Sequence, residues 1–330
     1  MKNRTLGNTG IAISPVGYGC MGLSHAYGTP LPKEEAAERI RQAYEFGYTF
    51  FDTAECYTGT YPDGSTAYNE EAVGLGIQGI RNHIVLASKF GVLHKWDHLE
   101  FDSSPETIRK SIDGSLKRLG TDYLDLYYQH RIDPKVEPET VAEVMGELIK
   151  EGKIRSWGIS AVNEDYLRRA HAVTPVSAVE NMYSMIDRDT EKLFPLFEQE
   201  GITMVAFTPL AKGFLTGRYL ERPVFSDAQD NRGGRYQFSE EGFAAYQSVL
   251  KLIADFAAQK GATSTQISLA WMLSKSPRVI PIPGTRTPSH MKENIESANF
   301  ELTAEEVAQI DTSLKAMNLA DTAAKRVSFK

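Results

Sequence analysis

Ile84-Val-Leu-Ala-Ser-Lys89 and Tyr123-Leu-Asp-Leu-Tyr-Tyr-Gln-His130 are two short apolar stretches on either side of a segment with helical features. That segment, residues 105–119, begins at Ser103-Ser-Pro-Glu106, which predicts a capping box with proline in the first turn. Apolar stretches of this length are typical of strands buried on both faces. A strand, a helix and a second strand in succession predict two parallel strands of one sheet.

The same alternation continues along the chain. Eight strands, each followed by a helix, favour an α/β fold of the closed (β/α)₈ type, a TIM barrel, over an open doubly wound sheet. The other expected strands are 15–19, 49–52, 154–160, 177–180, 203–207 and 279–282. The expected helices include 33–46, 138–150, 239–259 and 264–275, one that begins near Pro288, and a last one capped by Thr303-Ala-Glu-Glu306.

Two segments lie outside this repeat. Residues 5–13 contain an Asn-Thr-Gly turn between two short runs, which predicts an N-terminal β-hairpin. Residues 209–238 are rich in Gly, Pro, Arg and Asp, which is typical of a functional loop or lid. Because no Gly/Ser-rich or Pro-rich linker divides the chain, we expect one domain over residues 1–330, with extra helices at the C-terminal end.

Composition excludes several classes of protein. The chain has 36 Lys+Arg against 43 Asp+Glu, so its net charge of −7 argues against a nucleic-acid partner. A run of about 18 apolar residues, as a membrane span requires, is missing, and the first residues lack the apolar core of a signal peptide. Cys20 and Cys56 are too few for a disulfide framework. We therefore expect a cytoplasmic enzyme without a nucleic-acid or membrane partner.

Gly17-Tyr-Gly19-Cys-Met-Gly22 matches the G-x-G-x-x-G pattern of dinucleotide-binding folds. That motif requires a helix at its glycines and an acidic residue about 20 positions further on. The residues that follow, up to Pro32, do not predict a helix, and Asp52 lies 30 positions beyond Gly22. We interpret the glycines as positions where the backbone approaches something closely at the mouth of the first strand.

Polar side chains stand where three of the expected strands end. Asp52 ends the second strand, with Tyr57 five residues later, Lys89 ends the third and His130 ends the fourth. In a barrel these ends converge on one rim, where active sites form. A nearby ammonium lowers the pKa of a tyrosine, so we expect Lys89 to make Tyr57 a usable proton donor, with Asp52 holding Lys89 and His130 orienting the substrate oxygen.

These segments together resemble the aldo-keto reductases. The resemblance extends in order from about Arg4 to about Leu314, and it implies a (β/α)₈ barrel that reduces aldehydes and ketones with NADPH. It implies Asp52, Tyr57, Lys89 and His130 as the catalytic tetrad, with Tyr57 as the acid. The motifs that carry it are Phe51-Asp52-Thr-Ala-Glu-Cys-Tyr57, Ser88-Lys89, His130-Arg-Ile-Asp133, Gly158-Ile-Ser160 and Pro283-Gly-Thr-Arg286.

The resemblance also implies how NADP(H) is held, with NADH possible. Ser160 would bond the nicotinamide carboxamide, Phe207 would stack on the ring, and Arg286 would contact the adenosine 2′-phosphate. Helix N-termini after the seventh and eighth strands suit phosphates. The implied contacts are Gly22, Ser160, Glu180, Phe207, Pro209, Leu210, Gly213, Leu215, Gly284, Thr285, Arg286, His290, Glu293 and Asn294.

Three positions depart from the family pattern. Ala161 replaces a common Asn, Glu180 replaces the usual Gln, and His290 replaces an Arg, which weakens the preference for NADPH. A Glu180 carboxylate can accept a hydrogen bond from the carboxamide but cannot donate one. Its negative charge also leads us to expect a shift of cofactor preference toward NADP⁺, which Glu180→Gln would reverse.

Two other classes of function stay open at this point. One is a cofactor-sensing regulatory subunit with little turnover, because a fold does not determine a function. The other is a metal-dependent hydrolase or isomerase, for which only Asp52 and His130 are placed as ligands. The sequence does not identify the small-molecule carbonyl substrate, nor whether the protein is a monomer or a homo-oligomer. We expect Tyr27, Tyr61, Trp96, residues 209–238 and the tail beyond Ala316 to shape the substrate pocket, and Cys56 to be a packed residue.

Overall fold

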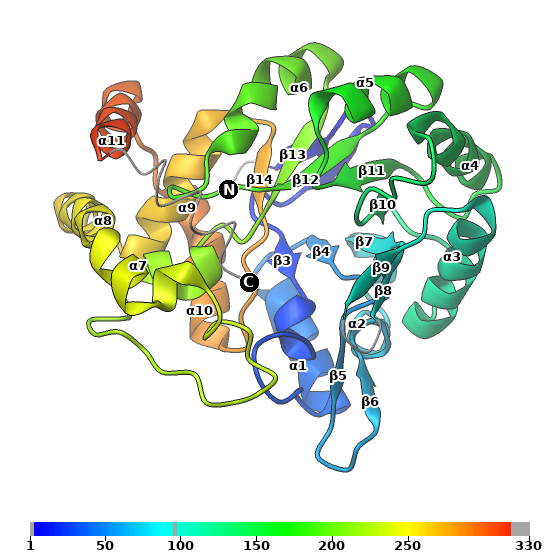
Figure 1. Cartoon of the computed structure of the whole chain (residues 1–330), viewed down its shortest axis with the longest axis horizontal. Coiled ribbons are helices and arrows are strands. Elements are labelled where there is room, and N and C mark those ends of the chain that lie inside the picture. Colours follow the sequence, from blue (N-terminus) through cyan, green and yellow to red (C-terminus); the bar gives the residue numbers. More distant parts are fainter. Residues whose placement is uncertain (1–2, 95–97, 318–330) are drawn as a thin grey trace.

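A computed structural model describes residues 3–94 and 98–317. Eight parallel strands form one sheet in the order β14-β13-β12-β11-β10-β7-β4-β3, with helices around its outside (Figure 1). Backbone bonds from Gly17 N to Pro281 O (2.9 Å) and from Gly19 N to Pro283 O (3.4 Å) join the first strand to the last. The predicted (β/α)₈ barrel is therefore confirmed. Its strands are β3 (Tyr18–Gly19), β4 (Phe50–Asp52), β7 (Val85–Phe90), β10 (Leu126–Gln129), β11 (Trp157–Ser160), β12 (Ala178–Met182), β13 (Thr203–Phe207) and β14 (Val279–Pro281).

The helices pack against the outer face of this sheet. Those predicted at 105–119, 138–150 and 264–275 have the predicted bounds, whereas the segment 239–259 divides into two helices at Tyr246. The helices are α1 (Lys33–Glu45), α2 (Asn69–Gly76), α3 (Pro105–Leu119), α4 (Pro138–Lys150), α5 (Glu164–Val173), α6 (Phe194–Glu200), α7 (Glu240–Ala245), α8 (Gln247–Lys260), α9 (Ser264–Lys275), α10 (Pro288–Glu296) and the additional C-terminal α11 (Ala304–Ala316). None of the described helices is long and apolar enough to cross a membrane.

Helix starts follow local capping chemistry. Thr303 and Glu306 form the predicted reciprocal capping box of α11. At α3 the cap is one residue later than predicted: the Ser104 side chain accepts a hydrogen bond from Thr107 N, and Pro105 occupies the first helical position. The predicted box based on Ser103 is therefore wrong, because Pro105 as the first helical residue makes Ser104 the N-cap.

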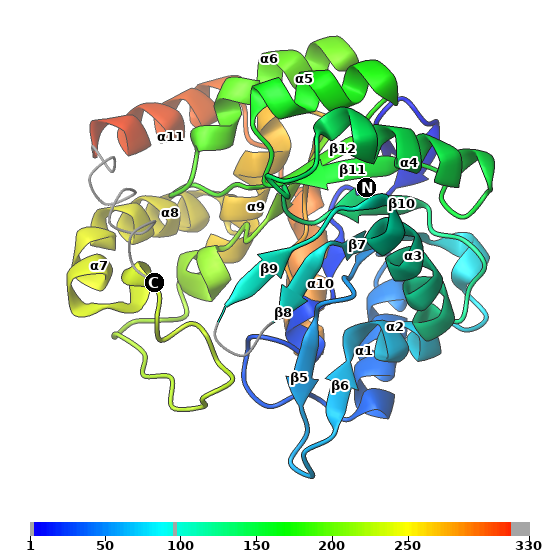
Figure 2. The same cartoon turned by 45° about the vertical axis from the view of Figure 1, so that its right-hand side comes forward.

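Three hairpins stand beside the barrel. The predicted N-terminal hairpin pairs β1 (Arg4–Leu6) with β2 (Ile11–Ile13). The hairpins β5 (Thr58–Thr60)–β6 (Thr66–Tyr68) and β8 (Val92–His94)–β9 (Leu99–Phe101) follow β4 and β7 and were not predicted (Figure 2). For β5–β6 the sequence holds a usable signal, Asp63-Gly64, since Asp-Gly is a common hairpin turn and Gly64 has φ +84°.

Side chains alternate between two apolar layers along the strands. One set fills the barrel interior, including Phe50, Val85, Ala87, Leu126, Tyr128, Ala178, Val205 and Ile280. Their chain neighbours face outward into the larger core beneath the helices, including Phe51, Leu86, Tyr127, Val179 and Met204. This period of two determines which polar residues can enter the interior where each strand ends.

The glycine pattern near the start of the chain is explained by the seam of the barrel. A Cβ on Gly19 would lie 2.7 Å from Ile282 O, and a Cβ on Gly284 would lie 2.5 Å from Gly19 O. Both distances are far below van der Waals contact, so the two backbones approach as closely as they do because neither residue has a side chain. The interpretation of Gly17-x-Gly19 as a site of close backbone approach is confirmed.

We expect Gly19→Ala to destabilise the barrel by about 1–3 kcal/mol, because the added methyl group overpacks the seam against backbone. Urea unfolding followed by circular dichroism measures this. Gly234→Ala is the control, since a Cβ there meets nothing within 4 Å. Equal stabilities of the two variants would contradict this account of the seam.

Candidate active site

One layer of polar side chains closes the carboxyl end of the barrel interior. On β4, Asp52 comes two residues after the inward-facing Phe50. On β7, Lys89 comes two residues after the inward-facing Ala87, which follows Val85 at the same spacing. The same spacing places further residues in this layer from the neighbouring strands. They are His130 after β10, Ser160 on β11, Glu180 on β12 and Phe207 on β13.

Lys89 is the centre of this layer. Its side chain has no exposed surface, and its ammonium donates hydrogen bonds to Asp52 Oδ1, to Thr53 O at 2.9 Å and to Tyr57 Oη at 3.3 Å. Burial acts to lower the pKa of Lys89, but Asp52, Glu180 and Tyr57 outweigh it and raise this pKa above its ordinary value. Lys89 is therefore a buried cation at neutral pH, beside Tyr57.

Tyr57 lies between two imidazoles. The His25 ring stacks on it with centroids 5.9 Å apart, and the His130 ring meets it edge-on at 5.6 Å. His25 Nδ1 lies 2.6 Å from Thr58 O, which holds the His25 ring in place. Cys56 is buried and its Sγ lies 3.4 Å from His130 Nδ1, so it packs against the site as expected. The structure thus brings the four predicted residues together and adds His25.

The expected pKa of Tyr57 is wrong in direction. Burial raises the pKa of Tyr57 well above its ordinary value, and the opposing effect of Lys89 is smaller. Sequence reasoning counted the ammonium but not the loss of water around the hydroxyl, which disfavours the phenolate. Tyr57 is consequently a protonated acid at neutral pH that gives up its proton only to a strong base, such as a developing alkoxide.

The expected charge of Glu180 also needs correction. Burial, followed by the charge of Asp52, raises the pKa of Glu180 to about 8 despite Lys89 and Arg131. This raised pKa favours the neutral carboxylic acid, and in that form Glu180 can donate a hydrogen bond as well as accept one. The direction of this pKa argues against the expected carboxylate that can only accept.

A cavity of about 700 Å³ opens over this layer. Asp52, Tyr57 and His130 line one end of it, whereas Lys89 lies behind them. Of the predicted cofactor contacts, Leu215 is buried in the core and Glu293 pairs with Arg218, so neither lines the cavity. The predicted contacts that do line it are Gly22, Ser160, Glu180, Phe207, Pro209, Leu210, Gly213, Gly284, Thr285, Arg286, His290 and Asn294.

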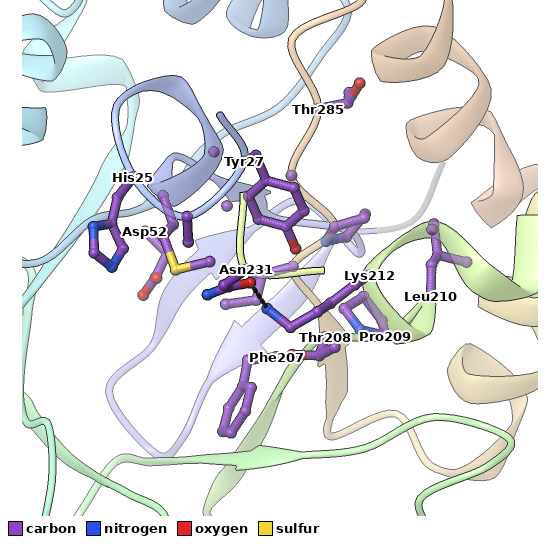
Figure 3. Close-up of a pocket in the computed structure, with 18 of the residues that line it drawn as sticks. His25, Tyr27, Asp52, Phe207, Thr208, Pro209, Leu210, Lys212, Asn231 and Thr285 are labelled. Atoms are coloured by element: carbon purple, nitrogen blue, oxygen red, sulfur yellow. Dashed lines mark hydrogen bonds between the residues drawn. The ribbon is translucent and has the colours of Figure 1, made fainter. Parts of the chain in front are cut away.

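The other end of the cavity is rich in cations, of which sequence reasoning predicted only Arg286. The Lys212 ammonium and the Arg232 guanidinium each lie 5.3 Å from the Tyr27 ring centroid, and Lys212 Nζ donates to Asn231 Oδ1 at 3.0 Å (Figure 3). Burial lowers the pKa of Lys212 to about 8. The available signal was the Arg-rich composition of residues 209–238. The basic residues that line this end are Lys212, Arg218, Arg232, Arg235 and Arg286.

Arg286 holds backbone in this structure. Its guanidinium donates to Gly22 O at 2.5 Å, to Thr29 O at 2.8 Å and to Gly28 O at 3.4 Å. These contacts tie the loop after β3 to the turn after β14. The contact with Gly28 O is the longest of the three. Arg286 Nη2, which makes it, is therefore the atom that can turn to another acceptor at the lowest cost.

Residues 209–238 cross the mouth of the cavity. Asn231 N donates to Ala26 O at 3.1 Å, Asp227 accepts from Thr29 N at 2.8 Å, and Gln229 bonds the backbone of Thr60. The expected loop thus connects to the β3 loop and to hairpin β5–β6. Tyr27 lines the cavity as expected, but Tyr61 does not, because it sits on the outward turn of that hairpin. Trp96 and residues 318–330 lie outside the described part of the chain.

The described residues contain no group of three or more His, Cys, Asp or Glu side chains arranged to hold a metal ion. The partner of Asp52 in this layer is the Lys89 ammonium.

Comparison with known proteins gives the family. A model of the Aldo/keto reductase family matches residues 15–315. Probable aldo-keto reductase 1 of Glycine max is 34% identical over 324 residues, which cover 97% of this chain and 90% of that protein. This chain belongs to the aldo-keto reductase family.

Solved structures agree with this assignment. A glycerol dehydrogenase from Gluconobacter oxydans shares the fold, with a TM-score of 0.84, 24% identity and 96% of each chain covered. An aldo/keto reductase from Klebsiella pneumoniae, solved in complex with NADP and acetate, has a TM-score of 0.70 and 27% identity, with 94% of this chain and 95% of that chain covered.

We expect Lys89→Met to make folding stability strongly dependent on pH. Without the ammonium, Asp52 and Glu180 keep buried carboxyl groups whose pKa values rise above unfolded values of about 4. A carboxyl group whose pKa is higher in the folded than in the unfolded state stabilises the fold fully at pH values below its unfolded-state pKa. This stabilisation is lost as the pH rises through the folded-state pKa. Relative to wild type, the variant should lose about 3–5 kcal/mol at pH 8 and less at pH 5, as measured by urea unfolding.

The control for this series is Lys251→Met, which removes a surface ammonium that pairs with Asp255. It should change stability by less than about 0.5 kcal/mol at both pH values. A loss in Lys89→Met that is the same at pH 5 and pH 8 would show that the carboxyl pair does not depend on Lys89.

Proposed function

We propose that the protein reduces an aldehyde or ketone to an alcohol with NADPH as the hydride donor. The observation that carries this proposal is the contact of Tyr57 Oη with Lys89 Nζ, 3.3 Å, at the end of the cavity that His130 also lines. An acid with a raised pKa beside a buried cation is suited to an oxygen that gains negative charge during the reaction. The family membership and the NADP found in the Klebsiella pneumoniae relative support the choice of cofactor.

The chain's own residues fit a dinucleotide phosphate. The cavity has an aromatic and polar end, with Phe207, Ser160 and Glu180, and a cationic end, with Lys212 and Arg286. We assign the first end to the nicotinamide and the second to the phosphates, because guanidinium and ammonium groups bind phosphate oxygens. Bound there, the cofactor supplies a hydride to the substrate carbon.

The remaining steps belong to protein groups. Lys89 donates to Tyr57 Oη, which leaves the Tyr57 proton free to be donated into the cavity. His130 orients the substrate oxygen beside Tyr57, since both rings face the same space. As the hydride reaches the carbonyl carbon, the carbonyl oxygen takes the proton of Tyr57, and Lys89 stabilises the phenolate that remains.

We further propose that residues 1–330 act as one domain in the cytoplasm, on small-molecule carbonyl compounds. The contacts of α11 support the single domain: Trp271 Nε1 and Lys275 Nζ on α9 both donate to Asp311 on α11. The buried free thiols of Cys20 and Cys56 are compatible with a reducing compartment.

The first test is NADPH oxidation at 340 nm with a panel of activated aldehydes, diketones and quinones. We expect Tyr57→Phe to lower kcat/KM by about 10²–10⁴-fold while the Kd of NADPH changes less than about twofold, because only the proton donor is lost. Tyr44→Phe, on α1 outside the barrel, should match wild type. Tight NADPH binding without turnover of any substrate would favour a cofactor-sensing subunit instead.

The second test concerns the 2′-phosphate. We propose that Arg286 turns Nη2 from Gly28 O to this phosphate. Arg286→Met should then raise the Kd of NADPH at least tenfold and that of NADH less than about threefold, since one charge-assisted hydrogen bond contributes about 1.5–3 kcal/mol. Fluorescence titration measures both, with Arg168→Met on the outer helix α5 as control. Equal weakening of both cofactors would limit Arg286 to holding the loop after β3.

A further inference from the structure

Glu180 is a buried carboxyl group with one oxygen, Oε2, that accepts no hydrogen bond from the described residues. Its side chain is 3% exposed, and Oε2 lies 3.5 Å from Lys89 Nζ with no hydrogen-bond partner among the described residues. A lysine ammonium has three protons to donate. Those of Lys89 go to Asp52, Thr53 O and Tyr57 Oη, so none remains for Glu180.

Among the described residues, the two acids of this cluster share one ion-pair partner, Lys89, whereas Arg131 acts on Glu180 from beyond ion-pair distance. Asp52 and Glu180 share the single ammonium of Lys89, and Asp52 has the shorter contact. A second carboxylate, buried without a hydrogen bond, is costly, so one of the two acids keeps a proton. The weaker contact identifies Glu180 as that acid, and its pKa of about 8 agrees with this assignment.

We propose that Glu180 stores the proton that carbonyl reduction consumes, and that it is neutral beside the reduced nicotinamide and ionised beside the oxidised one. This inference rests on the proposed function, because it takes the nicotinamide to lie between Phe207 and Glu180. The uncharged reduced ring then meets an uncharged acid, and the positive oxidised ring meets a carboxylate.

The proton has a path through contacts already described. The substrate oxygen takes the proton of Tyr57 while the substrate carbon takes the hydride, which carries the two electrons. Lys89 returns a proton to Tyr57 Oη across 3.3 Å and takes one from Glu180 across 3.5 Å. The products are the alcohol, the positive nicotinamide ring and the Glu180 carboxylate, so the net charge of the buried site does not change.

Several charged or titratable groups face Glu180, and each must be considered as the source of a pH effect on cofactor binding. Lys89 and Tyr57 keep their protons at neutral pH, because their pKa values are raised. Arg131, after β10, is a cation, and Tyr128 on β10 is fully buried with a raised pKa. Burial raises the pKa of Asp52 as well, and its Oδ2 has no hydrogen-bond partner among the described residues, but its contact with Lys89 opposes this rise. His130 also lines the cavity, so a variant of Glu180 is needed to assign a titration to this residue.

Direct binding of NADP⁺ and NADPH at several pH values tests the inference. In wild type, the ratio of the NADP⁺ Kd to the NADPH Kd should fall about tenfold per pH unit from pH 6 towards 8, because NADP⁺ must displace the Glu180 proton. The ratio cancels the titration of the 2′-phosphate, whose pKa is about 6 and which both cofactors carry. In Glu180→Gln the ratio should change less than about twofold over the same range.

Calorimetry of the wild-type protein provides a second readout. Titrations at pH 7 in phosphate and in Tris, which differ in ionisation enthalpy, should show about one proton released per NADP⁺ bound and none per NADPH. Glu143→Gln on the outer face of α4 is the matched control for Glu180→Gln, since it removes a surface carboxylate. It should retain the wild-type dependence of the Kd ratio on pH.

The outcomes separate this inference from the proposed function. A wild-type ratio that is flat with pH, or no proton release, would overturn the inference while cofactor binding itself still supports the reductase. A slope that persists in Glu180→Gln would assign the titration to another group, such as His130, and would also overturn it. Failure of both nucleotides to bind would overturn the proposed function and the inference together.

Discussion

A lysine ammonium with no exposed surface is the constraint on which the site depends. Burying a charge is costly unless carboxylates and hydrogen-bond acceptors replace the lost water. For Lys89 these groups are Asp52 at the end of β4, the carbonyl of Thr53 that follows it, and the hydroxyl of Tyr57. Glu180 on β12 adds a longer ion-pair contact. The strand β4 is paired with β7, whereas β12 is three strands away in the sheet order. The contact with Glu180 therefore crosses the interior of the barrel, and only a closed sheet brings it within 3.5 Å.

The same burial controls the chemistry of the neighbours of Lys89. Loss of water raises the pKa of Tyr57 and of Glu180, so both are acids at neutral pH in a layer that also holds a buried cation. A proton donor beside a buried cation suits such a layer to stabilise an oxygen atom that gains negative charge. The opposite end of the cavity is cationic, and residues 209–238 connect that end to the loop after β3. One cavity thus joins an end lined by buried acids beside a cation to an end lined by basic side chains.

The strands and most helices could be predicted because they depend on local patterns, and α3, α4 and α9 have the bounds that their periodicity and caps predict. The hairpins β5–β6 and β8–β9 were missed, since short strands beside a barrel lack a distinctive periodicity. The contacts of Arg286 with Gly22 O and Thr29 O could not be predicted, because they join residues more than 250 positions apart. The remaining site residues of the cofactor end stay predictions until a nucleotide is bound.

The sequence by itself determined the barrel and the residue types at its carboxyl rim: alternating apolar strands require a parallel sheet, and the period of two points Asp52, Lys89 and Glu180 into its interior. Tertiary structure alone decided their protonation. The pKa of each group depends on how much water is removed and on which charges stand within a few ångströms, and both follow from closure of the sheet rather than from neighbours in the chain.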